Sequence, residues 1–103
     1  MENFWKSISA EEAKELIKQK SHDEDFCILD VRTAGEFSGG AIEGAINLDI
    51  YSADFSKELE QLDKTKTYLI YCRSGSRSKL ALEMMKKAGF QFVYEVDRGI
   101  ISL

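Results

Sequence analysis

Cys72 stands where an apolar segment, YLIYC at residues 68–72, gives way to small and basic residues. Cationic neighbours and inward-facing backbone amides favour the thiolate form of a cysteine, and the thiolate is the nucleophile. A cysteine that ends an apolar strand is more commonly a core thiol, and that reading stays open at this point. The loop that could activate Cys72 consists of Arg73, Ser74, Gly75, Ser76, Arg77 and Ser78.

The composition of this loop predicts a site for negative charge. Small residues between a strand and a helix N-terminus allow backbone N–H groups to converge, and the helix dipole adds to their effect. Gly75 provides the conformational freedom, and Ser76 or Ser78 could cap the following helix. The one histidine, His22, lies in the distant KSHDED segment. A protease-type Cys–His pair is therefore not expected, and activation of the thiol would be electrostatic.

The elements that must position this loop alternate between helical and strand patterns. A capping box, Ser9 with Glu12, begins the first helix. Helices are expected at residues 9–20, at 54–62 and after the loop up to Gly89, and strands at 26–31, 45–48, 67–72 and 92–96. This alternation predicts an α/β fold with a mostly parallel sheet of about four to five strands. Reactive groups gather at the carboxyl ends of such strands, where Cys72 and Asp30 both fall.

Composition bounds the class of protein. A chain of 103 residues fits one domain, residues 1–103. The net charge of −4 argues against a general affinity for nucleic acid, and no apolar run approaches the roughly 18 residues of a membrane span. We expect a cytoplasmic protein, although a removed leader would be compatible with this sequence. Two cysteines form neither a disulfide framework nor a zinc pattern, so no metal and no cofactor are expected.

Four segments resemble the rhodanese family of sulfurtransferases, in the family's order and along nearly the whole chain. They are LDVRTAGEF, GGAIEGAINL, YCRSGSRS and AGFQFVYEVDRGI. The resemblance implies a three-layer α/β/α domain in which Cys72 takes a sulfane sulfur from a small anionic donor such as thiosulfate. The resulting persulfide would pass the sulfur to cyanide, a thiol or a protein acceptor. Arg73 and Arg77 would bind or steer the donor, and Asp30 with Arg32 would buttress the site.

Two other functions remain open on the same fold. Related phosphatases and arsenate reductases place five residues between their cysteine and arginine, whereas four separate Cys72 from Arg77 here, which disfavours a tetrahedral oxyanion. A binding module without catalysis is the other alternative, but inactive relatives typically lack the cysteine.

The chain departs from the family pattern in two places. Ala41 and Glu43 stand where relatives commonly have histidine and proline, and Arg98 replaces the first glycine of a Gly-Gly pair. If that glycine normally has positive φ, Arg98 would be strained by about 1 kcal/mol. Arg98 could also bring positive charge to the pocket. Cys27, within an apolar strand, is expected to be a buried inert thiol rather than a resolving cysteine.

Overall fold

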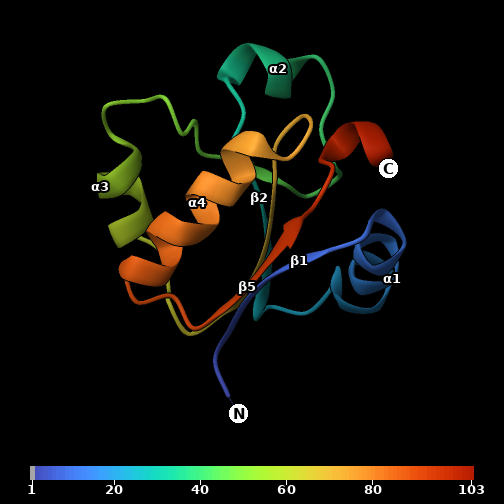
Figure 1. Cartoon of the computed structure of the whole chain (residues 1–103), viewed down its shortest axis with the longest axis horizontal. Helices are drawn as coiled ribbons and strands as arrows, with labels where there is room; N and C mark the ends of the chain where they lie inside the picture. The colour runs from blue at the N-terminus through green and yellow to red at the C-terminus, as the bar shows by residue number, and fades with distance from the viewer. Residues whose placement is uncertain (1) are drawn as a thin grey trace.

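The computed structural model describes residues 2–103. Its strands form one parallel sheet in the order β1-β5-β4-β2-β3 (Figure 1). The strands are β1 (Phe4–Ile8), β2 (Phe26–Asp30), β3 (Ile46–Asn47), β4 (Thr67–Tyr71) and β5 (Phe92–Val96). The helices are α1 (Ala10–Lys20), α2 (Ala34–Ser38), α3 (Phe55–Glu60) and α4 (Ser76–Lys87), with a final 3-10 turn, η1 (Ile100–Ser102). None of the helices in residues 2–103 is long and apolar enough to cross a membrane.

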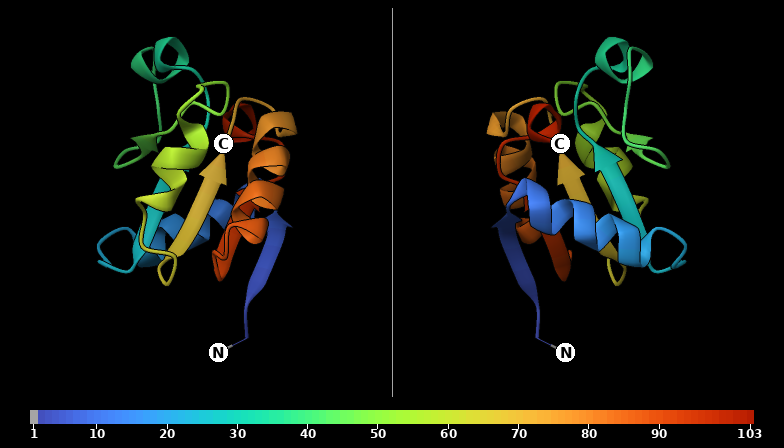
Figure 2. Two further views of the ribbon diagram at one scale, coloured as in Figure 1. Left: turned by 90° about the vertical axis from the view of Figure 1, so that its left-hand side faces the viewer. Right: turned by 90° about the vertical axis from the view of Figure 1, so that its right-hand side faces the viewer.

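The helices cover both faces of the sheet. Figure 2 shows α1 on one face and α3 with α4 on the other. Each face has its own buried cluster: Ala13 of α1 packs in one, while Phe55 of α3 and Met85 of α4 pack in the other. The expected three-layer α/β/α architecture is therefore confirmed, with five strands that are all parallel.

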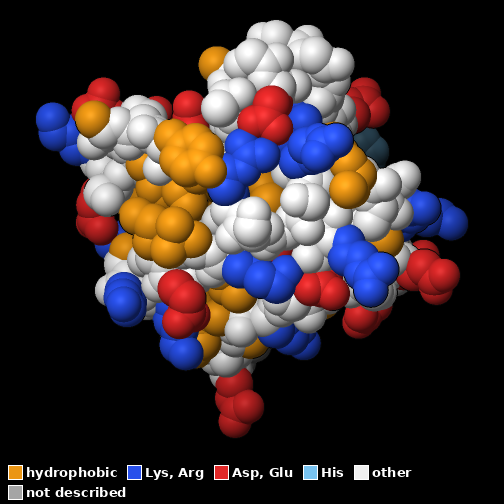
Figure 3. All heavy atoms as spheres, turned by 45° about the horizontal axis from the view of Figure 1, so that its top comes forward, with side chains coloured by type: hydrophobic (Ala, Val, Ile, Leu, Met, Phe, Trp, Pro, Cys, Tyr) orange, Lys and Arg blue, Asp and Glu red, His pale blue; other side chains and the backbone are white. Residues whose placement is uncertain are grey.

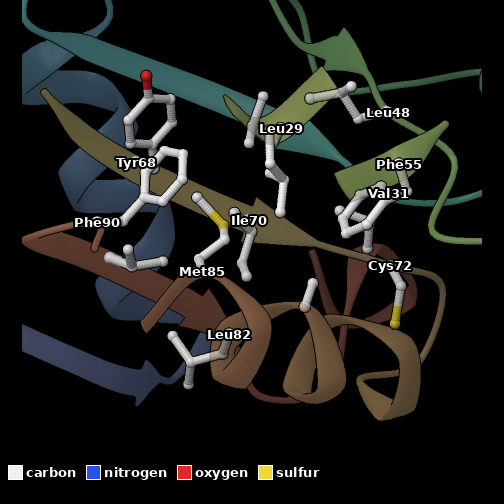
Figure 4. Close-up of a cluster of buried hydrophobic side chains, with 13 residues drawn as sticks. Leu29, Val31, Leu48, Phe55, Tyr68, Ile70, Cys72, Leu82, Met85 and Phe90 are labelled. Carbon is white, nitrogen blue, oxygen red and sulfur yellow. The ribbon is translucent and has the colours of Figure 1, made fainter. Parts of the chain in front are cut away.

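The central strand β4 decides which way Cys72 faces. Residues 68–72 are all buried, and successive side chains in a strand point to opposite faces. Tyr68, Ile70 and Cys72 accordingly join the cluster under α3 and α4, whereas Leu69 and Tyr71 join the cluster under α1. Figure 4 shows Cys72 following Tyr68 and Ile70 on this face, beside the start of α4. The alternation of β4 thus places the thiol on the α4 side.

Three elements differ from the sequence-based expectation. Strand β1 was not predicted, because FWKSI lacks a clean two-residue alternation, and it lies at the edge beside β5. Helix α2 lies between the strands expected at residues 26–31 and 45–48, where no helix was predicted, and its capping box of Thr33 and Glu36 was the missed signal. Helix α3 ends at Glu60, two residues earlier than expected. The first capping box, Ser9 with Glu12, is confirmed.

Candidate active site

The Cys72 loop closes around its own sulfur. The Gly75 amide donates a hydrogen bond to Cys72 Sγ at 3.0 Å, and Ser78 Oγ lies 3.4 Å from the same sulfur. Cys72 is fully buried, while the Arg73, Ser74 and Ser76 side chains are exposed. Helix α4 begins at Ser76 with Gly75 as its N-cap and no capping side chain, so the expected serine cap is wrong. Ser78 Oγ instead accepts a hydrogen bond from the Cys72 thiol, and its hydroxyl has Glu95 Oε2 and the Gly75 carbonyl oxygen as acceptors.

Two glycines let the loop backbone pack against the segment that follows β5. Gly75 has φ of 108°, and a Cβ there would overlap the carbonyl oxygen of Asp97. Gly99 has φ of 67°, and a Cβ there would overlap the carbonyl groups of Cys72 and Arg73. The Ile100 amide donates to the Cys72 carbonyl oxygen at 2.9 Å. Side chains at either glycine would force these two backbones apart, so the glycines fix the shape of the loop.

Hydrogen bonds favour the thiolate at Cys72. Burial by itself would raise the thiol pKa, but hydrogen bonds from the Ser78 hydroxyl and from the amides of Ser78, Gly75 and Ser74 outweigh burial and lower the pKa. The sequence analysis expected both the cationic neighbours and the loop amides to favour the thiolate, and the contacts that lower the pKa include the amides. The amides and the hydroxyl that surround the sulfur provide this effect.

Arg77 is held by an acidic partner. Its guanidinium donates to the two carboxylate oxygens of Glu36, at 2.6 and 3.0 Å, which ties α2 to the first turn of α4. This contact holds the pKa of Glu36 at about 2 and raises that of Arg77. The side chain of Arg73 is exposed, and within residues 2–103 it forms no ion pair. Arg73 is thus the loop arginine whose charge is available to an incoming anion.

The surface around the loop combines basic and apolar side chains. Figure 3 looks onto the end of the molecule where the strands finish, and it shows Lys and Arg side chains near the centre beside a group of hydrophobic ones. The ring of Tyr51, which is 70% exposed, lies 5.8 Å from the Arg77 guanidinium carbon. The surface beside the Cys72 loop therefore offers positive charge next to an aromatic ring.

Asp30 and Arg32, which were expected to buttress the site, form a buried ion pair that supports a different segment. The Arg32 guanidinium donates to Asp30 at 2.7 Å and also to the Gly40 carbonyl oxygen. Tyr71 donates to Asp30 at 2.9 Å and accepts from the Ile42 amide. Burial raises the pKa of Tyr71 to about 12. This buried network therefore fixes the connection at residues 40–42, on the α1 side of the sheet.

Glu95 is the polar residue of this region that the sequence analysis missed. It lies on β5, is fully buried, and accepts hydrogen bonds from Ser78 Oγ and Ser7 Oγ, each at 2.5 Å. The Lys79 ammonium group lies 3.5 Å from Glu95 Oε2 and 2.9 Å from Asp97. One signal was available: a lone acid within the apolar strand FVYEV. Buried carboxylates are rare unless paired or functional.

Two further expectations are settled by position. Cys27 pairs with Tyr68 across β2 and β4, four residues before Cys72, or about 13 Å along the strand. That separation excludes a disulfide with Cys72 in this fold. Cys27 is partly buried, and burial raises the pKa of its thiol, as expected of an inert group.

The strain expected at Arg98 does not occur, because within residues 2–103 only glycines have positive φ, and Gly99 holds that conformation.

The fold and the cysteine loop define an α/β domain with a candidate nucleophile at the end of its central strand, and comparison with known proteins identifies the family. Residues 9–102 match the Rhodanese-like domain family, so the chain belongs to that family. A solved rhodanese-related protein from Thermoplasma volcanium is 31% identical, with a TM-score of 0.79 over 95% of this chain and 89% of that one.

Two relatives illustrate the range of the family. The Bacillus subtilis (strain 168) protein named "Putative sulfurtransferase YtwF" is 34% identical over 94% of this chain and 88% of its own length. A protein of Pelagibacter ubique (strain HTCC1062), named tRNA uridine(34) hydroxylase, is 33% identical over 79% of this chain. This chain covers only 27% of that hydroxylase.

Proposed function

We propose that the protein is a sulfurtransferase that carries sulfane sulfur as a persulfide on Cys72. The proposal rests on the surroundings of Cys72 at the end of β4. Its Sγ atom accepts a hydrogen bond from the Gly75 amide and lies beside Ser78 Oγ. These donors favour a nucleophilic sulfur without a histidine base. The similarity to a sulfurtransferase-named relative over most of both chains supports the same chemistry.

The reaction proceeds in two steps. The Cys72 thiolate attacks the outer sulfur of a donor such as thiosulfate, the S–S bond of the donor breaks, and sulfite leaves with the electron pair. The loop amides that stabilise the thiolate also stabilise the negative charge of the persulfide. An acceptor thiolate or cyanide then attacks the outer sulfur, and Cys72 departs as the leaving group.

Arg73 and Arg77 have different roles beside the Cys72 loop. Arg73, exposed and without an ion pair within residues 2–103, attracts the sulfonate end of the donor. Arg77, bound to Glu36, chiefly holds α2 against the loop. We expect the donor to be a small anion and the acceptor to be a thiol, on a small molecule or on a protein.

Intact mass spectrometry after brief exposure to thiosulfate tests this function. Wild-type protein and the Cys27→Ser variant should each gain one sulfur atom, which cyanide or an added thiol removes, while Cys72→Ser should gain none. If folded wild type gains no sulfur from thiosulfate or other sulfane donors, catalysis by persulfide is wrong. The loop would then be an anion-binding or partner-binding site.

The hydroxylase relative favours a second candidate, in which this domain contributes Cys72 to a tRNA modification carried out by a longer protein. The net charge of −4 argues against strong tRNA binding by this chain alone. A tRNA hydroxylation assay with wild type and Cys72→Ser separates the two candidates. Cys72-dependent hydroxylation without a persulfide would favour the second.

A further inference from the structure

Glu36 binds the guanidinium group of Arg77 at both of its terminal nitrogens. Arg77 Nη1 donates to Glu36 Oε1 at 2.6 Å, and Nη2 donates to Oε2 at 3.0 Å. The amide and the hydroxyl of Thr33 also donate to Oε1, at 3.2 and 3.1 Å, so the carboxylate is fixed from two sides. Two parallel hydrogen bonds are a strong geometry for an arginine–carboxylate pair. An anion that needs Arg77 as a partner must therefore compete with Glu36.

The charges of this pair act on Cys72 in opposite directions. Hydrogen bonds from Arg77 lower the pKa of Glu36 to about 2, so the carboxylate is ionised at neutral pH. Hydrogen bonds to Glu36 raise the pKa of Arg77, and the charges of Glu36 and Cys72 raise it further, which places Arg77 within electrostatic reach of the sulfur. Near the sulfur, the negative charge of Glu36 therefore offsets most of the positive charge of Arg77.

The cations near the loop other than Arg73 have acidic neighbours. Lys79 is bound to Asp97 at 2.9 Å and lies 3.5 Å from the buried Glu95. Arg98 is exposed and follows Asp97 in the chain; the pKa of that carboxyl is lowered by the hydrogen bond from Lys79 and also by the charge of Arg98. Arg73 is exposed and forms no ion pair within residues 2–103. The attraction of the loop for a donor therefore comes mainly from Arg73.

We propose that Glu36 is a specificity-determining residue, which by neutralising Arg77 makes the site prefer sulfane donors with one negative charge over dianionic thiosulfate. This inference rests on the sulfur transfer proposed above. The preferred class comprises organic persulfides, R–S–S⁻, and organic thiosulfonates, R–SO₂–S⁻. The Cys72 thiolate attacks the outer sulfur of either donor, the S–S bond breaks, and R–S⁻ or the sulfinate R–SO₂⁻ leaves with the electron pair. Each such donor brings one negative charge fewer than thiosulfate to the thiolate.

Two alkylating reagents test the electrostatic effect without a sulfur donor. Iodoacetate carries one negative charge and iodoacetamide carries none, and both react with the thiolate, so the ratio of their rates reports the potential at Cys72 and is independent of the thiolate fraction. Cys27→Ser is the background, so that a single thiol reports. Glu36→Gln should raise the ratio of iodoacetate to iodoacetamide rates about threefold. An unchanged ratio in folded Glu36→Gln would overturn the proposal.

Glu60→Gln is the matched control, because it also removes one acid and frees one cation. Glu60 of α3 is bound to Lys64 at 2.9 Å, and Lys64 precedes β4 whereas Cys72 follows it. The control pair thus lies toward the opposite end of β4, beyond the range at which salt leaves an exposed charge unscreened. Glu60→Gln should leave the ratio nearly unchanged. An equal rise in both variants would reflect net charge alone and would refute a specific role for Glu36.

Arg77→Gln tests whether the two charges cancel. This variant leaves Glu36 without its partner and should lower the ratio of alkylation rates about threefold. The double variant, Glu36→Gln with Arg77→Gln, should return the ratio close to that of wild type, because the intact pair contributes little net charge. A double variant that keeps the ratio of either single variant would refute the cancellation.

Donor turnover tests the specificity itself. A potential acts on every charge of a ligand, so a change that favours a monoanion threefold favours a dianion by about the square of that factor. In Glu36→Gln, kcat/KM for thiosulfate should therefore rise about threefold relative to kcat/KM for methanethiosulfonate, mainly through KM. The two donors react with the same thiolate, so a change in the Cys72 pKa cancels in this comparison. Equal changes for both donors would refute selection by charge.

A measurement on wild type covers the case in which these variants do not fold. At low salt, kcat/KM for methanethiosulfonate should exceed that for thiosulfate once each value is divided by the rate of that donor with a simple thiol. A preference for thiosulfate would overturn the proposal. If neither donor transfers sulfur, the proposed function fails, whereas the alkylation ratios still decide whether Glu36 neutralises Arg77.

Discussion

Replacing Gly75 by alanine should damage the Cys72 loop more than its conformation alone explains. Two costs add at this position. The φ of 108° is unfavourable for alanine by about 1 to 2 kcal/mol, and the new Cβ would overlap the Asp97 carbonyl oxygen. Moving the loop to relieve that overlap adds about 1 to 3 kcal/mol. We therefore expect the free energy of unfolding to fall by about 2 to 5 kcal/mol.

The same displacement should weaken the hydrogen bond from the Gly75 amide to Cys72 Sγ, now 3.0 Å long. A hydrogen bond to a charged group contributes about 1.5 to 3 kcal/mol, so its loss should raise the Cys72 pKa by about one to two units. Urea unfolding measures the first effect, and the pH profile of Cys72 alkylation measures the second.

Gly44→Ala is the matched control. Gly44 also has positive φ, 85°, but a Cβ there has no atom within 4 Å. This variant should lose only the conformational part, about 1 to 2 kcal/mol, and should keep the Cys72 profile of wild type. Equal losses in both variants, or an unchanged Cys72 pKa in Gly75→Ala, would refute the argument that close packing against Asp97 shapes the loop.

Three further substitutions test the charged contacts. Glu36→Gln should cost about 1 kcal/mol at neutral pH, because the ion pair with Arg77 is partly exposed. The folded pKa of Glu36, about 2, lies below its ordinary value of 4.5, so its contribution is present above pH 4.5 and lost as the pH falls toward 2. Urea midpoints across that range should therefore fall less in Glu36→Gln than in wild type, and parallel curves would contradict this. Asp30→Asn leaves the buried Arg32 without its counter-charge and should cost about 3 to 5 kcal/mol; a loss below about 1 kcal/mol in urea unfolding would show that the pair is dispensable. Arg73→Ala should raise the KM for thiosulfate several-fold at low salt with little change in stability, and an unaltered KM would rule out donor capture by Arg73.

Sequence patterns predicted the parts of the fold that depend on one element at a time. The apolar runs of β2 and β4, the capping box of α1 and the cysteine loop all carry local signals. Strand β1 has only a weak local signal, because its strand conformation depends on pairing with β5. Phe4 pairs with Phe92 and Ile8 with Val96. Pairing between segments so distant in the chain leaves no local period to detect.

The site was predictable to the same extent. Cys72 and its loop were identified from residue types, and the supporting role of Asp30 and Arg32 from the resemblance to the rhodanese family. Which segment that pair supports depends on the alternation of β4, which places Tyr71 and the sulfur of Cys72 on opposite faces. Glu95 was missed for a similar reason, since only the fold brings β5 beneath Ser78.

The division between hydrogen bonds and charges at this site has a consequence for salt. The donors that favour the Cys72 thiolate are amides and a hydroxyl that surround a buried sulfur, where mobile ions screen them little. Arg77 forms an ion pair with Glu36, so attraction of the donor depends on the exposed Arg73. Salt screens the electric field of an exposed charge. Salt should therefore weaken capture of an anionic donor while leaving the pKa of the sulfur nearly unchanged. The reactivity of the sulfur and the recruitment of its substrate are thus determined by separate groups.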